Sequence, residues 1–111
     1  MTTIATIQTL TAATFDEAIA ASPVPVLVDV WAEWCPPCHA LDPVLEAIAA
    51  EQADRLRVMK INSDEHPQVS VRYGVMSLPT MLVFRDGAVV GRLVGARGKA
   101  RLLQDIDDAL G

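Results

Sequence analysis

Cysteine is scarce in this sequence, and Cys35 and Cys38 are the only two among 111 residues. A chain of this length can bury a core without disulfide staples or a structural metal, so we expect a single domain over residues 1–111. In a reducing compartment, two neighbouring cysteines are more often catalytic or metal-binding than structural. The pair is therefore the first candidate for function.

Basic residues and long apolar runs are also lacking. Nine lysines and arginines stand against 14 acidic residues, and the net charge of -5 argues against a nucleic-acid-binding module. No apolar run approaches the roughly 20 residues of a membrane span. The first residues, 1–4, lack the charged and apolar regions of a signal peptide. We expect a cytoplasmic protein with neither a nucleic-acid nor a membrane partner.

Hydrophobic residues make up 51% of the chain, and their spacing predicts alternating strands and helices. Strands are predicted at residues 4–10, 24–30, 56–61, 80–84 and 88–94. Helices are predicted from a Thr14–Glu17 capping box to Ser22, after the cysteines, at 66–73 and at 98–110. The early alternation implies parallel strands, and a hairpin at Asp86-Gly87 adds an antiparallel edge. The sequence predicts an α/β fold with a mixed five-stranded sheet and helices on both faces.

The two cysteines stand between a buried strand and a helix. Residues 24–30 are nearly all apolar, as in a central strand covered on both faces, and an apolar stripe at helical spacing begins at Leu41. Pro43 lies about one turn into this helix, so we expect a kink there. Two residues between cysteines at a helix start place the sulfurs close enough to form a bridge.

The start of this helix favours a thiolate at Cys35. The N-terminal thiol lies at the positive end of the helix macrodipole, beside N–H groups without helical partners, and the thiolate is the nucleophile. We expect Cys35 to be the more exposed thiol and to attack a substrate disulfide. Cys38, one turn further in, then attacks the mixed disulfide and releases the reduced product.

Asp29 is unusual because a carboxylate within an apolar strand is costly unless it is paired or protonated. Desolvation would raise its pKa and make it an acid or base near neutral pH. We therefore expect Asp29 to exchange a proton with Cys38. The alternative is a purely structural ion pair with Lys60, which shares one face of its strand with core residues.

These residues resemble the active-site segment of the thioredoxin family. The resemblance covers essentially the whole chain, in order and without sizeable gaps. The matching motifs are Val28-Asp29-Val30, the Trp31–Cys38 segment, Pro43 in the helix, the Lys60 strand, Leu78-Pro79-Thr80, the Asp86-Gly87 hairpin and Gly95. The resemblance implies the thioredoxin fold, with sheet order 1-3-2-4-5 flanked by four helices, and a general protein-disulfide reductase.

The resemblance also implies roles for the matching residues. Cys35 is the nucleophile, Cys38 the resolving thiol, and Asp29 the buried proton acceptor, which Lys60 tunes. Pro79 is in a cis peptide bond, which the sequence alone does not predict because few X–Pro bonds are cis. The implied substrate-binding residues are Trp34, Pro36, Pro37, Leu78, Pro79 and Gly95, with Trp31 and Pro43 packing at the site.

No bound cofactor and no metal is implied by the resemblance, because the redox-active Cys35–Cys38 disulfide itself carries the two electrons. These come from NADPH through a flavin-containing thioredoxin reductase and pass to disulfide-containing target proteins. We expect a monomer. Acidic residues elsewhere are predicted to be solvated and without a function; they are Asp16, Glu17, Asp54, Asp64, Glu65 and Asp105 to Asp108.

Three positions depart from the usual family pattern. Pro36 stands where glycine is usual, and with Pro37 it leaves both positions between the cysteines without an N–H. The Cys38 N–H must therefore do more to stabilise a Cys35 thiolate. His39 replaces a lysine and could carry partial charge near pH 7. Met76 replaces a common charged residue, which predicts a more apolar docking rim.

Other functions also fit parts of the sequence. Cys35 to His39 match the C-x-x-C-H pattern of c-type haem attachment, but the β-α pattern is not that of a helical cytochrome. Structural zinc would need His39 and His66 as further ligands. A thiol-independent binding subunit is a third alternative. A disulfide oxidant or isomerase is a fourth, which keeps the enzyme and reverses its direction.

Overall fold

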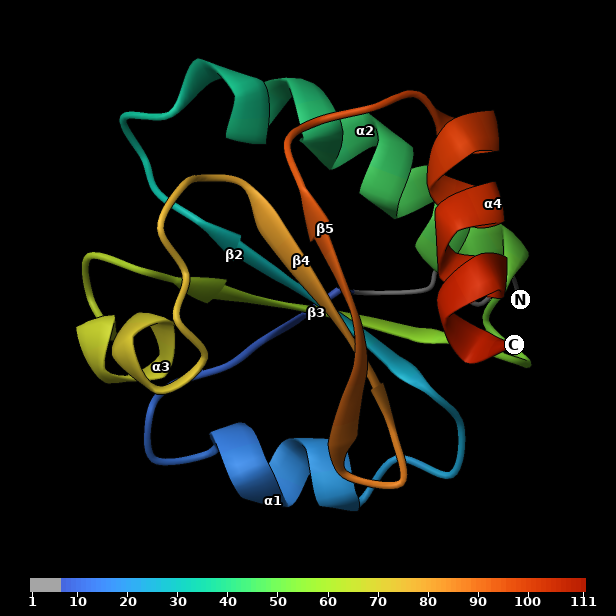
Figure 1. Cartoon of the computed structure of the whole chain (residues 1–111), viewed down its shortest axis with the longest axis horizontal. Coiled ribbons are helices and arrows are strands. Elements are labelled where there is room, and N and C mark those ends of the chain that lie inside the picture. Colours follow the sequence, from blue (N-terminus) through green and yellow to red (C-terminus); the bar gives the residue numbers. More distant parts are fainter. Residues whose placement is uncertain (1–6) are drawn as a thin grey trace, which may run out of the picture.

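The computed structural model describes residues 7–111 and contains one five-stranded mixed sheet (Figure 1). The strands are β1 (Gln8–Thr9), β2 (Val26–Trp31), β3 (Arg57–Asn62), β4 (Thr80–Arg85) and β5 (Ala88–Val94). The helices are α1 (Phe15–Ala20), α2 (Pro36–Glu51), α3 (Pro67–Arg72) and α4 (Lys99–Leu110). The strand order, β1-β3-β2-β4-β5, confirms the thioredoxin fold that the family resemblance implied.

Strand β2 lies at the centre of the sheet. It pairs in parallel with β3 and antiparallel with β4. Its residues from Val26 to Val30 are all buried, as the continuous apolar run predicted. Because both edges are hydrogen-bonded and both faces are covered, the end of β2 is a fixed point from which the next segment starts.

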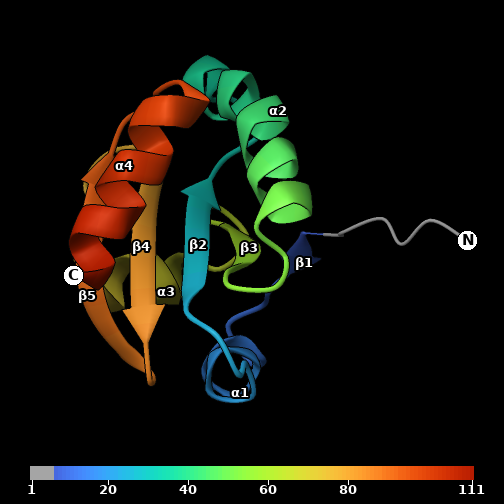
Figure 2. The same cartoon turned by 90° about the vertical axis from the view of Figure 1, so that its right-hand side faces the viewer.

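The helices cover the sheet in two pairs. Phe15 and Ile19 of α1 and Val69 of α3 belong to a core cluster on one face. Leu45 of α2 and Leu102 of α4 belong to the cluster on the other face. Figures 1 and 2 both show α2 next to α4. The predicted inward residues of the closing helix all lie in this second cluster; they are Leu102, Leu103, Ile106, Ala109 and Leu110.

The start of α1 differs from the prediction. Thr14 is the N-cap residue, but its side chain makes no capping hydrogen bond. Its hydroxyl instead accepts a hydrogen bond from the Thr11 N–H at 3.0 Å, so it stabilises the turn before the helix. The predicted capping box is therefore wrong. Residues 4–6 of the predicted first strand lie outside the described part of the chain.

The hairpin between β4 and β5 has the predicted turn. Asp86 and Gly87 both have positive φ, at 52° and 81°. This is the backbone combination that asparagine, aspartate and glycine tolerate best and that matches the twist of paired strands.

None of the helices formed by residues 7–111 is long and apolar enough to cross a membrane.

Gly91 of β5 lets α4 approach the sheet closely. A Cβ placed at Gly91 would stand 2.5 Å from the Cβ of Ala109 and 3.6 Å from the Cβ of Val83. The first distance is far inside van der Waals contact, and neither a strand backbone nor a helical alanine can move aside cheaply. The absence of a side chain at residue 91 therefore sets the distance between β5 and α4.

We predict that Gly91→Ala lowers the free energy of unfolding by about 1–2 kcal/mol, because the overlap outweighs the entropy that alanine removes from the unfolded chain. Urea denaturation of the oxidised protein measures the change. The matched background is Ala109→Gly, which removes the opposing Cβ. The cost of Gly91→Ala should be smaller there. An equal cost in both backgrounds would show that this contact is not the cause.

Candidate active site

The end of β2 leads into the N-terminus of α2, where the two cysteines lie. Cys35 is the N-cap residue, with an extended backbone (φ -102°, ψ 101°), and Pro36 and Pro37 occupy the first helical positions. Proline suits these positions because its fixed φ is helical and its missing N–H would have no helical partner there. The two prolines therefore help to start the helix directly after Cys35.

Cys35 and Cys38 are joined by a disulfide, with their Cα atoms 5.3 Å apart. The backbone N–H of Cys38 donates a hydrogen bond to the Sγ atom of Cys35 at 3.3 Å. This is the contact that the two N–H-free prolines led us to expect. An amide donor and a helix N-terminus both favour negative charge on sulfur, so the geometry suits a reactive Cys35 thiolate after reduction.

The exposure predicted for Cys35 is not seen. In this disulfide state Cys35 is 2% exposed, which barely differs from 1% for Cys38. Ala32 is buried with the two cysteines, and Trp31 and Leu78 pack against this cluster. The neighbouring strand end and the Leu78 loop thus cover the disulfide, which sequence spacing could not reveal.

Asp29 is fully buried in the middle of β2. In the sheet it is paired with Lys60 of β3 and Met81 of β4. Neither carboxylate oxygen has a hydrogen-bond partner among residues 7–111. Burial raises the pKa of Asp29 to about 7, the negative charge of Asp42 adds to the rise, and the charge of Lys60 lowers it. Asp29 can therefore gain or lose a proton near neutral pH.

The charge of Lys60 lowers the pKa of Asp29, but Lys60 does not form the ion pair of the alternative reading. The Lys60 ammonium lies over the Trp31 ring, 5.1 Å from its centroid. This is a cation–π contact. Neither carboxylate oxygen of Asp29 accepts a hydrogen bond from Lys60. The ion pair of the alternative reading is therefore absent between these two residues, and the proton-transfer role of Asp29 stays a prediction.

Leu78, Pro79 and Gly95 lie together beside the disulfide. The Leu78–Pro79 peptide bond is cis, as the family resemblance implied. The Gly95 N–H donates to the Pro79 carbonyl at 2.9 Å, which continues the pairing of β4 with β5. Gly95 has a φ of +92°, a conformation that glycine adopts more easily than other residues. Since Leu78 packs on the cysteine cluster, the Leu78–Pro79 segment borders the disulfide, and Gly95 is joined to this segment through Pro79.

Trp34 is the exposed aromatic residue of the site. Its side chain is 67% exposed, and its Nε1–H donates to Asp64 at 2.7 Å. Asp64 was expected from the sequence to be a solvated charge without a function, so this contact was not predicted. Asp64 is separated from Trp34 by about thirty residues of chain, and no local sequence pattern links the two. The hydrogen bond fixes the indole next to Cys35.

The residues that depart from the family pattern have clear positions. The Nε2 atom of His39 lies 2.6 Å from the Glu33 carbonyl oxygen, and this hydrogen bond is the main reason that the pKa of His39 is raised. Asp42 adds to the rise from 3.7 Å. Met76 is 93% exposed.

Pro43 lies inside α2, which continues through it. The predicted kink at Pro43 stays a prediction.

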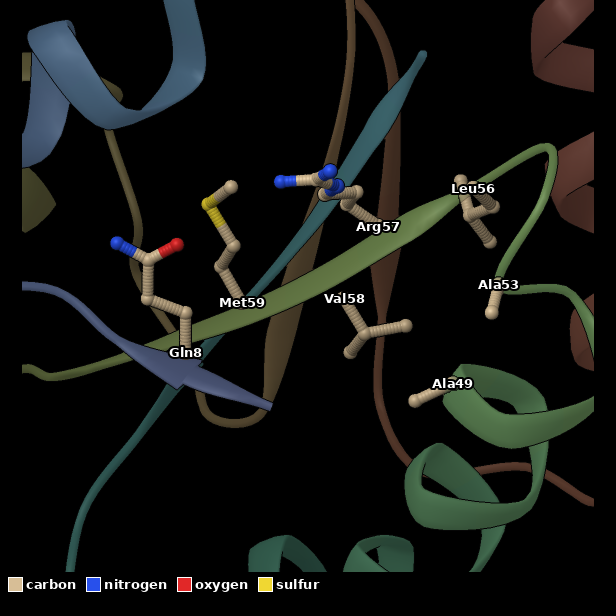
Figure 3. A pocket seen from close by; sticks show the side chains of 7 residues that line it. All are labelled: Gln8, Ala49, Ala53, Leu56, Arg57, Val58 and Met59. Atoms are coloured by element: carbon tan, nitrogen blue, oxygen red, sulfur yellow. The ribbon is translucent and has the colours of Figure 1, made fainter. Parts of the chain in front are cut away.

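Within residues 7–111, no three histidine, cysteine or acidic side chains gather as metal ligands would. A cavity of about 260 Å³ lies between β1, the start of β3 and the end of α2 (Figure 3). It is lined by Gln8, Ala49, Ala53, Leu56, Arg57, Val58 and Met59. None of the predicted site residues borders it.

Comparison with known proteins identifies the family. Residues 6–108 match the family model described as Thioredoxin. A thioredoxin from Mycolicibacterium smegmatis is 51% identical over 98 residues, which cover 86% of this chain and 88% of that protein. Thioredoxin 1 from Synechococcus elongatus is 44% identical over 101 residues, which cover 91% of this chain and 94% of that protein.

A third relative is larger. The bifunctional thioredoxin reductase/thioredoxin of Mycobacterium leprae is 46% identical over 101 residues, which cover 91% of this chain and 22% of that protein. The matches extend over nearly the whole chain and include the bridged cysteine pair. This chain therefore belongs to the thioredoxin family, and its Cys35–Cys38 pair is the redox-active disulfide of a protein-disulfide reductase.

Proposed function

We propose that the reductase works through Cys35 as the attacking thiol and Cys38 as the resolving thiol. The observation that carries this assignment is the hydrogen bond from the Cys38 N–H to the Cys35 Sγ atom at the start of α2. It stabilises negative charge on the sulfur of Cys35 and not on that of Cys38. The more stabilised thiolate is the better candidate for the first attack at neutral pH.

The cycle begins with both cysteines reduced. The Cys35 thiolate attacks one sulfur of a target disulfide, which breaks and releases the other sulfur as a thiolate. The Cys38 thiol then loses its proton and attacks the Sγ atom of Cys35 in the mixed disulfide. The second target sulfur leaves as a thiolate, the target has gained two electrons, and the Cys35–Cys38 disulfide has formed.

Asp29 is proposed to accept the Cys38 proton, directly or through water. A general base works best when its pKa is close to the working pH, and burial raises the pKa of Asp29 to about 7. The carboxylate has no competing hydrogen-bond donor among the described residues. Lys60 is proposed to keep the pKa of Asp29 from rising further.

We propose that a target peptide docks along the Leu78 backbone, between Trp34 and Gly95. This docking groove also includes Pro36, Pro37 and Pro79. Packing at the site is assigned to Trp31 and Pro43. Trp34 offers an exposed aromatic face held by Asp64. Aromatic side chains of this kind are common in protein interfaces. The exposed Met76 would extend the groove with an apolar rim.

The partners follow from the family. Thioredoxins reduce disulfide-containing proteins and are themselves reduced again by a reductase. The Mycobacterium leprae relative is named as a bifunctional protein that combines thioredoxin reductase and thioredoxin. We propose that this chain is a single-domain monomer of the cytoplasm, recharged from NADPH by a separate flavin-containing reductase. No bound cofactor is proposed, because the disulfide carries the electrons.

Cys38→Ser should trap a covalent complex with target proteins, because the mixed disulfide forms at Cys35 and no thiol then resolves it. Non-reducing gels of the reduced variant mixed with insulin measure the adduct, which dithiothreitol should release. Cys35→Ser is the matched control and should give no adduct. If Cys35→Ser traps insulin and Cys38→Ser does not, the two roles are exchanged.

The equilibrium reduction potential of the pair should lie near about -270 mV, as expected for a reductase of this family. It is measured by tryptophan fluorescence in dithiothreitol or glutathione buffers of defined ratio. A value near about -180 mV or above, the range of isomerases and oxidants, would contradict reduction as the physiological direction. The two prolines would then have favoured the dithiol over the disulfide.

Asp29 should make the oxidised protein less stable as the pH rises. Its folded pKa of about 7 lies above the ordinary aspartate pKa of 3.8, so the folded state holds the proton more tightly than the unfolded state. The contribution of Asp29 to the free energy of unfolding is complete below about pH 4, decreases between about pH 4 and pH 7, and is lost above about pH 7. The difference between the two pKa values corresponds to a loss of about 4 kcal/mol in the free energy of unfolding.

Asp29→Asn should remove this dependence, so the variant gains stability over the wild type as the pH rises from 4 to 8. Urea denaturation across that range measures the difference, and Asp54→Asn, at an exposed acidic residue, is the control. Asp29→Asn should also slow the release of product from the mixed disulfide about 10²-fold near neutral pH. Parallel stability profiles for wild type and Asp29→Asn would contradict the raised pKa.

A further inference from the structure

Arg97 lies in the short loop that connects β5 to α4. The loop follows Val94 and Gly95, whose backbone runs beside Thr80 and Pro79. This segment forms one wall of the docking groove proposed above. Val94 is 51% exposed, so the wall presents an apolar side chain as well as backbone. Any group that fixes this loop also fixes the shape of the groove.

The guanidinium of Arg97 makes three contacts with this region. One terminal nitrogen donates to the Val94 carbonyl at 2.5 Å, and Nε donates to the Gly95 carbonyl at 3.4 Å. The other terminal nitrogen donates to the Asp105 carboxylate at 2.5 Å. A planar guanidinium suits this arrangement because its donors point in fixed, different directions. Arg97 therefore ties the groove wall to the second turn of α4.

This contact is sheltered from solvent. The side chains of Arg97 and Asp105 are 13% and 25% exposed. Screening by water and salt is weaker at such a site than at a fully exposed ion pair. Asp105 was expected from the sequence to be a solvated charge, but its side chain is largely buried against Arg97. The partner of Asp105 lies eight residues earlier, beyond the one-turn spacing of helical pairs.

The loop itself has little else to define its shape. Glycines stand at both of its ends, Gly95 with φ +92° and Gly98 as the N-cap of α4. Gly98 provides no side-chain cap to the helix. Glycine lowers the cost of many backbone conformations, so a Gly-Ala-Arg-Gly loop is not rigid on its own. Among the described residues, Arg97 makes the side-chain hydrogen bonds that hold this loop.

We propose that Arg97, anchored by Asp105, is a positioning residue for protein substrates, since it holds the Val94–Gly95 wall in the shape that docks a target peptide. This inference rests on the proposed docking groove. It concerns binding and leaves the sulfur chemistry unchanged, because the contacts of Arg97 lie on β5 and α4 and not on the cysteine cluster. A small disulfide compound does not need the groove to bind, so its rate of reaction should not depend on Arg97.

The test is a single-turnover comparison of two oxidants. Reduced Arg97→Gln is mixed with increasing insulin, and tryptophan fluorescence gives the saturating rate and the half-saturating concentration. The half-saturating concentration should rise about fivefold, the size expected when charge-assisted hydrogen bonds to the wall are lost. The saturating rate, the rate with 5,5′-dithiobis(2-nitrobenzoate) and the reduction potential should stay at wild-type values. Asp105→Asn should behave in the same way, without adding to Arg97→Gln in the double variant.

Arg101→Gln is the matched control. It removes the same charge beside Asp105, at 3.8 Å, but the Arg101 side chain is 75% exposed and makes no hydrogen bond to the described part of β5. Its half-saturating concentration should equal that of the wild type. An equal rise in Arg101→Gln would overturn the inference in favour of a general charge effect.

Leu78→Asp separates failure of this inference from failure of the groove. If Leu78→Asp weakens insulin docking and Arg97→Gln does not, Arg97 is not a positioning residue although the groove stands. If neither variant weakens docking, the proposed groove is wrong and the inference falls with it. Should Arg97→Gln lack a folded near-ultraviolet circular dichroism spectrum, Arg97→Lys is judged by the same criteria, since a lysine ammonium cannot reproduce the three-way contact.

Discussion

The structure depends on the double burial of β2. This strand is hydrogen-bonded to β3 and β4 and covered by helices on both faces. Such a strand cannot shift in register without moving its side chains to the wrong face. Its C-terminal end therefore has a defined position, and Cys35, the N-cap residue of α2, follows a few residues later. The redox pair takes its place from the most constrained strand of the sheet.

The same burial gives Asp29 its chemistry. An unpaired carboxylate at the centre of a sheet works against folding whenever it is charged. The fold tolerates it because the proton is held until the pH approaches about 7. Replacing Asp29 by an apolar residue would remove the group that the resolving step is proposed to use. Stability and reactivity thus make opposite demands on one side chain, which is common at functional sites.

Much of the fold could be predicted from the sequence because its signals are local. The apolar run of β2, the helical stripe after Cys38 and the Asp86-Gly87 turn each lie within one short segment, and each was confirmed. The strand order came from the family resemblance, since periodicity does not say which strands are neighbours. The Thr14–Glu17 capping box failed because a neighbouring threonine offered another partner.

The site could be predicted in part. The cysteines, Asp29 and the Cys38 N–H contact followed from residue types and from what proline lacks. The burial of Cys35 did not, because Leu78 reaches it from a distant part of the chain. The partners Asp64 and Asp105 were missed for a similar reason. A surface carboxylate has no sequence signature until its donor is known.

The N–H that contacts the Cys35 sulfur belongs to the main chain of residue 38. With prolines at 36 and 37, the intervening residues have no amide hydrogen to share this task. Any residue except proline at position 38 would supply the same donor. The donor to the Cys35 sulfur is therefore a backbone group that does not depend on the side chain at residue 38. A substitution that removes the second sulfur would leave this donor in place, within the same turn of helix.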